Sequence, residues 1–321
     1  MCAPSKTELP RIPVVIEFLA DQSGSMDSDG KWSAMRDALL ATFEEMQTAA
    51  EPAILVGLIR YDVSVGRSVE PHALTAPGAH YDRLVTVIDT AGPGGGNSGV
   101  EAALKAGYEA VDEADIPVNS GLATDRMKRV VVLISDGPPS GATGKAETAH
   151  CEDLAFDAFN AQPPAGPLLT FAVGIGPFPS TTTAYDPGFM GRLAQNGGTG
   201  PVGCDPEATD VAAACHFQVT PQGTSVTTAL LKEAIDEIRA QSAPCELRFT
   251  LGTPVGGVQV VVTTKDGKAM PIAKDDKNGW SFDDPANPTK VILRGDACSA
   301  SNGTRSGRVD FIAGCAADGG T

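Results

Sequence analysis

Acidic and hydroxyl side chains follow two apolar segments of this 321-residue chain. Asp21, Ser23 and Ser25 form the string DQSGSM directly after one apolar run, and Asp136 directly follows another. Carboxylate and hydroxyl oxygens are hard ligands, and a set with few protein charges and room for water suits Mg²⁺ or Mn²⁺ better than zinc. These residue types therefore predict a site for a divalent cation.

The two apolar runs are predicted to be buried strands, and polar groups just past the carboxyl ends of such strands line the usual ligand crevice of an open α/β sheet. If Asp21 and Asp136 approach to about 5 Å, their repulsion at an effective dielectric constant of about 20 is roughly 3 kcal/mol. A cation bound between the two carboxylates would turn this net repulsion into a net attraction. The alternative interpretation is a strand-end turn in which Asp21 and Ser23 only cap the next helix.

Strands and helices are predicted to alternate over the first 240 residues. Apolar strands are expected over residues 14–20, 53–61, 130–135, 168–173 and 216–220, with a short edge strand over 65–69. Helices are expected over residues 33–46, 81–89, 100–111, 151–160, 187–195 and 225–239. This order predicts an α/β fold with a doubly wound, mainly parallel, Rossmann-like sheet that helices cover on both faces.

The composition changes after residue 242, where helical periodicity ends. Short apolar runs separated by Gly, Pro, Asn and Asp then predict a small all-β module, in which Trp280 and Phe282 are core residues. The expected organisation is an N-terminal segment over residues 1–12, an α/β domain over 13–242 and a C-terminal β module over 243–321.

Three features together resemble the von Willebrand factor type A (VWA) domain and its metal-ion-dependent adhesion site (MIDAS). They are the D-x-S-x-S string after a strand, the Gly-rich loop GPGGGNSGVEAAL before a helix, and the later strand that ends in Asp-Gly. The resemblance runs from residue 13 to about residue 241. It implies that Ser23 and Ser25 coordinate the ion through their hydroxyls, while Asp21 and Asp136 act directly or through water.

The family's remaining ligand is a threonine in the Gly-rich loop, and this loop contains no threonine. Ser98 falls nearest that place and Asn97 is the alternative, unless the loop is only a flexible turn. Asp27 and Asp29 are somewhat like the second-ion site of integrin β chains, with a solvated loop as the other interpretation. The expected ion is Mg²⁺ or Mn²⁺, with Ca²⁺ as an alternative.

Charge and hydropathy exclude several classes of partner. The chain has 24 basic and 40 acidic residues, a net charge of −16 and a pI near 4.6, so nucleic acid and anionic membrane surfaces would repel it on average. Its longest apolar runs are far shorter than the roughly 20 residues of a membrane-spanning helix. We therefore expect neither nucleic acid as a partner nor a membrane span.

Five of the seven cysteines lie after Asn196, in an acidic, Gly/Pro-rich context, which predicts disulfides and an oxidising compartment. Cys204 with Cys215, and Cys298 with Cys315, are candidate pairs. The family resemblance implies a bridge between Cys2 and Cys245 near the domain's termini, and Cys151 is then the odd thiol.

The expected location is secreted, periplasmic or cell-surface, after removal of a signal segment. Lipidation of Cys2 is the alternative role for that cysteine. Several stretches, including KWSAMRDALL, also resemble secreted VWA proteins or lipoproteins of deltaproteobacteria and myxobacteria.

The leading functional hypothesis is a non-enzymatic adhesion or protein-interaction module whose ion binds a carboxylate of a partner protein. Asp62 and the loop 140–148 are expected to contribute specificity. The alternative is a structural subunit of an extracellular fibre or surface assembly, in which the partner is another copy of the chain. A metal-assisted hydrolase is disfavoured because Ser23 and Ser25 have no evident base. An intracellular chaperone-like protein working with an ATPase is disfavoured by the cysteines and the β module.

Overall fold

The structure is a computed structural model, and part of the chain in it is described. The described residues are 5–8, 13–49, 53–74, 78–90, 92–94, 96–115, 127–140, 144–162, 166–177, 185–242, 245–248, 258–263, 269–277, 279–286, 288, 290–294, 297 and 308–313.

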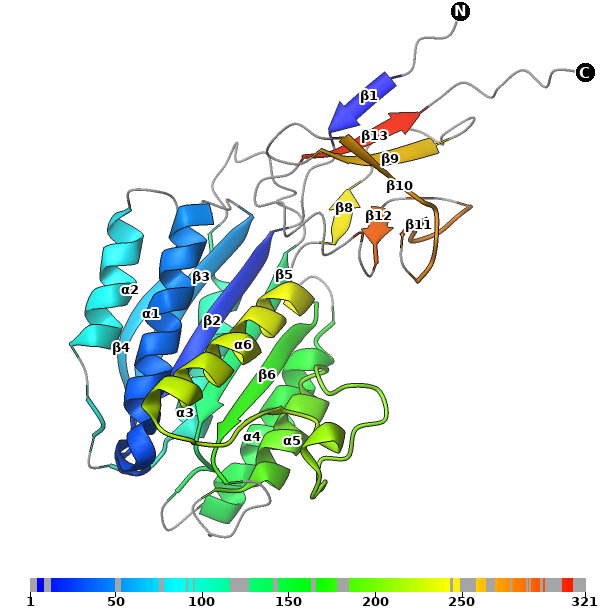
Figure 1. Ribbon diagram of the computed structural model, residues 1–321. Coiled ribbons are helices and arrows are strands. Elements are labelled where there is room, and N and C mark those ends of the chain that lie inside the picture. Colours follow the sequence, from blue (N-terminus) through cyan, green and yellow to red (C-terminus); the bar gives the residue numbers. More distant parts are fainter. Residues whose placement is uncertain are drawn as a thin grey trace, which may run out of the picture.

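A six-stranded sheet forms the centre of the larger domain, in the order β4-β3-β2-β5-β6-β7 (Figure 1). All neighbours in this sheet run parallel except β4, which is antiparallel to β3. The strands are β2 (Val14–Asp21), β3 (Ile54–Tyr61), β4 (Val65–Ala73), β5 (Lys128–Ser135), β6 (Leu168–Ile175) and β7 (Phe217–Val219). The predicted α/β fold with a mainly parallel sheet is confirmed.

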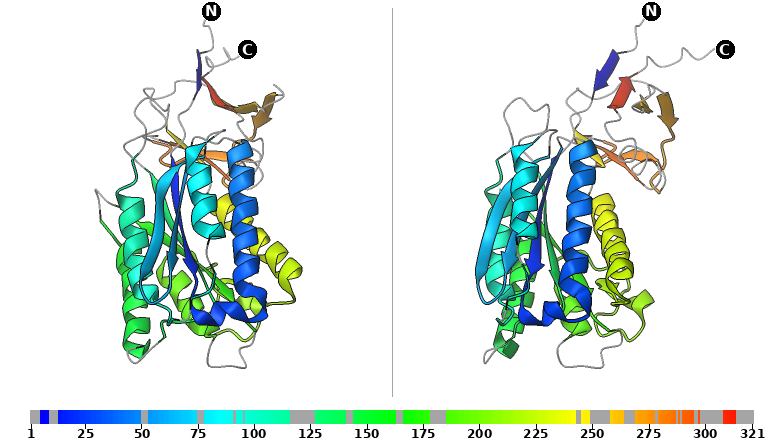
Figure 2. Two further views of the ribbon diagram at one scale, coloured as in Figure 1. Left: turned by 90° about the vertical axis from the view of Figure 1, so that its left-hand side faces the viewer. Right: turned by 60° about the vertical axis from the view of Figure 1, so that its left-hand side comes forward.

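Six helices cover the two faces of this sheet (Figures 1 and 2). They are α1 (Lys31–Ala49), α2 (Ala79–Asp89), α3 (Val100–Asp112), α4 (Gly144–Phe159), α5 (Pro187–Asn196) and α6 (Thr224–Ser242). Helices α1, α2 and α6 pack into one apolar cluster with the sheet, and α3, α4 and α5 pack into a second. The period of two along each strand explains both clusters: Ile16 and Phe18 of β2 face the first, and Val15 and Leu19 face the second.

The start of α1 differs from the sequence prediction. The helix begins at Lys31 rather than near Ser33, and a 3-10 segment over Gly24–Gly30 precedes it. Asp29 and Gly30 both have positive φ, at 56° and 68°, so the chain turns sharply there before α1 begins. These two left-handed residues end the 3-10 segment. The pattern of hydrophobic residues in the sequence gives no sign of this turn.

The C-terminal strands form two further small sheets. The strands are β8 (Glu246–Arg248), β9 (Val258–Thr263), β10 (Ala269–Ile272), β11 (Trp280–Phe282), β12 (Lys290–Leu293) and β13 (Arg308–Ala313). One sheet has the order β11-β12-β8 and the other β1-β13-β9-β10, in which β1 is Ser5–Glu8 from the N-terminal segment. The sequence did not predict that this segment pairs with the far end of the chain.

The β module has its own apolar cluster, which includes Leu247, Trp280 and Val291. Trp280 is buried, as expected for a core residue. In both views the module lies beyond the amino ends of the parallel strands, and the 3-10 segment that follows β2 lies at the opposite end of the domain (Figures 1 and 2). The carboxyl ends of the strands therefore face away from the module.

The cysteines agree with part of the disulfide prediction. Cys204 and Cys215 form a disulfide with 5.1 Å between their Cα atoms. Cys245 is also disulfide-bonded, while Cys2, Cys298 and Cys315 lie outside the described residues. Cys151 is a buried free thiol, and burial raises its pKa to about 12, so it stays protonated and unreactive at neutral pH. Among the described helices, none is long and apolar enough to cross a membrane.

Candidate metal centre

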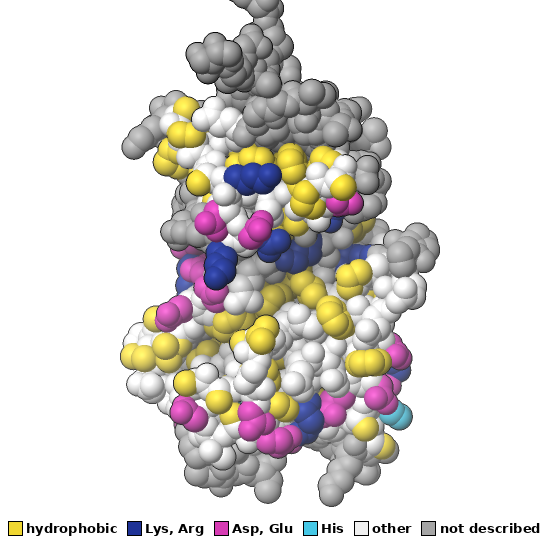
Figure 3. Space-filling model, turned by 90° about the vertical axis from the view of Figure 1, so that its right-hand side faces the viewer, with side chains coloured by type: hydrophobic (Ala, Val, Ile, Leu, Met, Phe, Trp, Pro, Cys, Tyr) yellow, Lys and Arg dark blue, Asp and Glu magenta, His cyan; other side chains and the backbone are white. Residues whose placement is uncertain are grey.

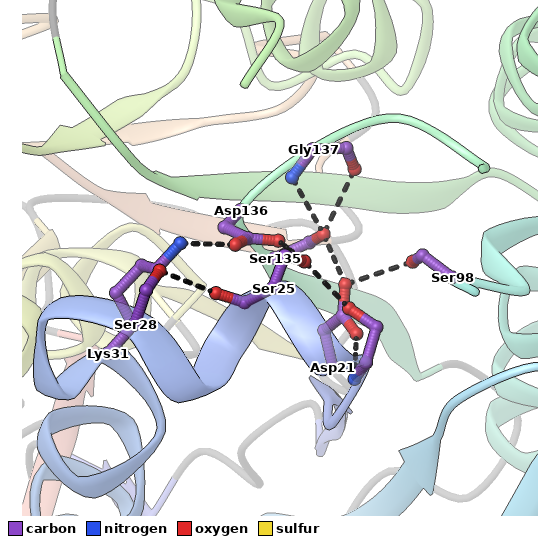
Figure 4. A network of polar contacts seen from close by, with 9 residues as sticks. Asp21, Ser25, Ser28, Lys31, Ser98, Ser135, Asp136 and Gly137 are labelled. Atoms are coloured by element: carbon purple, nitrogen blue, oxygen red, sulfur yellow. Dashed lines mark hydrogen bonds and ion pairs between the residues drawn. The ribbon is translucent and has the colours of Figure 1, made fainter. Parts of the chain in front are cut away.

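Two neighbouring parallel strands bring the acidic groups of the candidate site together. Asp21 is the last residue of β2, and Asp136 follows the last residue of β5, with which β2 pairs. Both carboxylates are almost fully buried, Asp21 at 0% and Asp136 at 3% exposure. The sheet register therefore places at one edge two side chains that are 115 residues apart in the sequence (Figure 4).

Asp21 accepts hydrogen bonds from three segments of the chain. Its Oδ1 accepts from the backbone N–H of Ser23 at 2.8 Å. Its Oδ2 accepts from the Oγ of Ser98 at 2.9 Å and from the Oγ of Ser135 at 2.6 Å (Figure 4). Ser135 also accepts a hydrogen bond from the backbone N–H of Gly137 at 3.1 Å, so its hydroxyl is oriented toward Asp21. This carboxylate links the motif loop, the Gly-rich loop and the end of β5.

A second chain of contacts runs from Ser23 to Lys31. The Oγ atoms of Ser23 and Ser25 are 3.1 Å apart, and the Oγ of Ser25 donates to Oδ1 of Asp136 at 2.8 Å. The other oxygen of Asp136, Oδ2, accepts from Nζ of Lys31 in an ion pair (Figure 4). Because Ser25 uses its hydrogen for Asp136, Ser23 is the donor to Ser25.

Backbone hydrogen bonds fix the Gly-rich loop against the motif loop. The N–H of Gly94 donates to the carbonyl of Gln22 at 2.6 Å, and the N–H of Gly99 donates to the carbonyl of Asp62 at 2.5 Å. Ser98 is held further by Ser140, whose Oγ accepts from the Ser98 N–H at 2.8 Å. These contacts place the Ser98 hydroxyl, 5% exposed as a residue, beside Asp21.

Burial dominates the electrostatics of the site. It raises the pKa of Asp21, and the hydrogen bonds from Ser135 and Ser23 partly offset that effect, while the nearby charge of Asp136 adds to it. Burial also raises the pKa of Tyr61, the last residue of β3, and the neighbouring Asp21 reinforces the shift. A nearby positive charge would favour the ionised form of Asp21.

The structure brings five of the predicted site residues into one network, namely Asp21, Ser23, Ser25, Ser98 and Asp136. The other three candidates lie outside it: Asn97, Asp27 and Asp29 are exposed residues with no hydrogen bond to this network. Their solvated-loop interpretation is the one that the geometry favours.

Sequence reasoning did not place three residues in this network. Ser135 is the last residue of β5, one position before Asp136, and Ser140 begins the loop that the sequence predicted only to contribute specificity. Lys31 is the single basic residue between Asp21 and Met35, and that isolation was the available signal for it. Its contact with Asp136 depends on the turn before α1, which the sequence did not reveal.

The donor set fits a hard divalent cation. Within the described residues, no group of three or more His, Cys, Asp or Glu side chains is placed to hold a metal ion. The network instead offers two carboxylates and three serine hydroxyls, all of them oxygen ligands that suit Mg²⁺, Mn²⁺ or Ca²⁺. Such a cation would also offset the cost of burying both carboxylates.

Comparison with known families identifies the larger domain. Residues 16–138 match the family model of the von Willebrand factor type A domain, a span that contains all five residues of the network. Together with the helix-covered sheet, this match shows that this part of the chain is similar to a VWA domain. No curated protein matches the sequence.

Several solved structures are similar in fold. The pilus adhesin SpaC from Lactobacillus rhamnosus GG aligns with a TM-score of 0.50 and 11% identity over 95% of this chain and 40% of its own. A von Willebrand factor type A protein from Catenulispora acidiphila aligns with a TM-score of 0.49 and 13% identity, over 97% of this chain and 64% of its own.

A third similar structure is proximal thread matrix protein 1 from the mussel byssus, with zinc in its MIDAS motif. It aligns with a TM-score of 0.44 and 16% identity, over 78% of this chain and 52% of its own. This chain thus spans 40% to 64% of the length of the three structures. At these identities the likeness concerns the fold alone.

Proposed function

We propose that this chain is a non-enzymatic adhesion or protein-interaction module that binds a partner's carboxylate through a divalent cation. One observation carries the proposal: the oxygen-bearing side chains of Asp21, Ser23, Ser25, Ser98 and Asp136 form one network at the carboxyl end of the sheet. These residues would hold the ion, with Mg²⁺ or Mn²⁺ as the expected metals.

The bound ion would supply a Lewis-acidic position for one oxygen of the partner's carboxylate. Other residues of the chain would hold the proposed ligands in place. Ser135 and Ser98 orient the Asp21 carboxylate, and Ser140 fixes the backbone of Ser98. The hydroxyl of Ser25 is engaged with Asp136 rather than with a histidine base, which supports binding rather than nucleophilic chemistry.

The proposal extends to the compartment. The disulfide between Cys204 and Cys215 and the disulfide-bonded state of Cys245 support an oxidising, extracellular or cell-surface location, as in the secreted bacterial VWA proteins that the sequence resembles. A lipid anchor at Cys2, the alternative to a disulfide there, belongs to the same proposal, and Cys2 lies outside the described residues.

Titration calorimetry tests the metal site directly. Mg²⁺ and Mn²⁺ are titrated into chelator-stripped protein and into two variants, Asp136→Asn and Asp27→Ala. We expect one ion per chain for the wild type, loss of binding for Asp136→Asn, and unchanged binding for Asp27→Ala, which removes one exposed negative charge beside the site. Binding that survives Asp136→Asn would contradict the proposed ligand set.

The second candidate function is a subunit of an extracellular fibre or surface assembly. The observation that favours it is the position of the candidate site and the β module at opposite ends of the molecule (Figures 1 and 2). A contact between the site of one copy and the module of the next is head-to-tail, and such contacts build open filaments when they do not close into a ring. Light scattering that rises with protein concentration and falls with a chelator would support this candidate.

A further inference from the structure

A lysine ammonium lies at one of the two carboxylates of the proposed metal site, that of Asp136. Nζ of Lys31 donates to Oδ2 of Asp136, while Oδ1 of Asp136 accepts from Ser25, so both oxygens of this carboxylate are engaged. The side chains of Lys31 and Asp136 are only 11% and 4% exposed. Salt screens a buried pair much less than a surface pair.

The backbone before α1 fixes Lys31 in this position. Asp29 and Gly30 take left-handed φ values and turn the chain, so that Lys31 becomes the first residue of the helix. A Cβ atom at Gly30 would lie 2.5 Å from Oγ1 of Thr224 at the start of α6. Glycine at this position therefore permits both the turn and the close approach of α6, and Lys31 enters the site from a constrained segment.

The charges around Asp136 make a cation and Lys31 competitors. The network contains the carboxylates of Asp21 and Asp136 and one ammonium, that of Lys31. A dication bound to Asp136 would repel an ammonium held on the same carboxylate, by several times the thermal energy at about 4 Å and an effective dielectric constant of about 20. One of the two must therefore leave Oδ2 of Asp136 when the other binds.

We propose that Lys31 is the internal counter-ion of the metal-free site and sets the affinity of that site for a divalent cation. The inference rests on the proposed metal site and names a residue that regulates it. In the metal-free protein, Lys31 stabilises the buried carboxylate of Asp136. A cation that binds Asp136 would have to displace this ammonium, so the ion pair would lower the affinity of the site for the cation.

The test compares Lys31→Gln with a matched control, Lys232→Gln. Lys232 of α6 also pairs with carboxylates, those of Glu45 and Asp236, but these lie on α1 and α6 rather than at the site. Lys31→Arg keeps the positive charge. Mg²⁺ and Mn²⁺ affinities are measured by calorimetry on the full chain, and the melting temperature is measured with a chelator and with added Mg²⁺.

We expect Lys31→Gln to bind Mg²⁺ about 10-fold to 100-fold more tightly than the wild type, and to melt about 5–15 °C lower in chelator, with the loss reversed by Mg²⁺. Lys232→Gln should leave the metal affinity unchanged. Lys31→Arg should bind metal no more tightly than the wild type. Folding of Lys31→Gln only when Mg²⁺ is present would also support the role of Lys31 in the metal-free site.

Equal affinities for the wild type and Lys31→Gln would overturn the role of Lys31 and leave the proposed metal site standing. Failure of the wild type and of both folded Lys31 variants to bind either ion would overturn the proposed metal site and the role of Lys31 with it. Binding by Lys31→Gln alone would support the competition and show that the ammonium keeps the unmodified site closed to metal.

Discussion

Ser98 is the residue on which the completeness of the proposed metal site depends. The family resemblance implies a threonine at Ser98 or, as the alternative, at Asn97, and the Oγ of Ser98 donates to Oδ2 of Asp21 at 2.9 Å. The extra methyl group of threonine adds no ligand atom, so a serine hydroxyl offers the same oxygen. We therefore expect Ser98 to serve in place of the threonine.

This argument predicts the behaviour of two variants at residue 98. Ser98→Ala removes the hydroxyl and should weaken Mg²⁺ binding about 10-fold, because the loss of one hydrogen-bonding oxygen at a charged group costs about 1.5 kcal/mol. Ser98→Thr keeps the oxygen and should bind like the wild type. Calorimetry on both variants is the check, and an alanine variant with undiminished affinity would remove Ser98 from the ligand set.

Strand β2 contains a fully buried carboxyl group. Glu17 lies in its middle with 0% exposure, and within the described part of the chain its two carboxyl oxygens have no hydrogen-bond partner. Gly57 on the neighbouring β3 leaves the space, since a Cβ atom there would lie 1.8 Å from Oε2 of Glu17. Burial raises the pKa of Glu17 well above its usual value, and the charge of Glu70 adds to the shift.

The raised pKa of Glu17 predicts how the stability of the folded protein changes with pH. The folded protein keeps the Glu17 proton to a higher pH than the unfolded chain does. The contribution of Glu17 to stability is therefore complete below its unfolded pKa and is lost as pH rises toward the folded value, by about 1.4 kcal/mol per pH unit. Glu17→Gln has no such proton, so its unfolding free energy should fall less between pH 5 and 8.

Urea denaturation of wild type and Glu17→Gln at pH 5, 6, 7 and 8 measures this difference. Other titrating groups are common to both proteins and cancel in the comparison. Parallel stability curves would show that Glu17 is already ionised in the folded strand, with a partner outside the described residues.

At the scale of the molecule, the domain and the module have separate apolar cores. Two clusters lie within the sheet and helices of residues 13–242, and the third lies within the module. Figure 3 shows one face of both parts. Its Lys and Arg side chains lie mostly around the junction with the module, where Asp and Glu lie too, and the charged side chains nearer the site end are mostly Asp and Glu. With a net charge of −16 the chain repels an acidic partner at long range, so the proposed function requires a carboxylate that the partner presents locally.

Separate cores and a distant candidate site predict that the α/β domain folds and binds metal without the module. A truncated chain of residues 13–242 should unfold in one cooperative transition and bind Mg²⁺ within about twofold of the full chain. Circular dichroism and calorimetry are the measurements. Loss of the cooperative transition would mean that the boundary at residue 242, or the removed N-terminal strand β1, is part of the domain's stability.

The sequence alone determined the alternation of strands and helices, because short apolar runs rich in β-branched residues, such as Val130–Ile134, are typical of buried strands. It also pointed to Asp21, Ser23, Ser25 and Asp136 as candidates, because a strand end followed by small polar residues is a local pattern. Ser98, with Asn97 as the alternative, was a candidate only through the family resemblance of the Gly-rich loop. Tertiary structure decided what these residues contact.

The pairing of β1 with β13 and the ion pair of Lys31 with Asp136 join segments that are far apart in the sequence. The isolated position of Lys31 in the sequence does not show that Asp136 is its partner, and a four-residue strand such as β1 carries no pattern that identifies β13 as its neighbour. Burial of Glu17 is the same case: its strand reads as apolar, and only the packing around Gly57 shows that a carboxyl group is enclosed there. Local sequence patterns thus determine where the strands and helices lie. Contacts between distant segments determine which partners the charged side chains have.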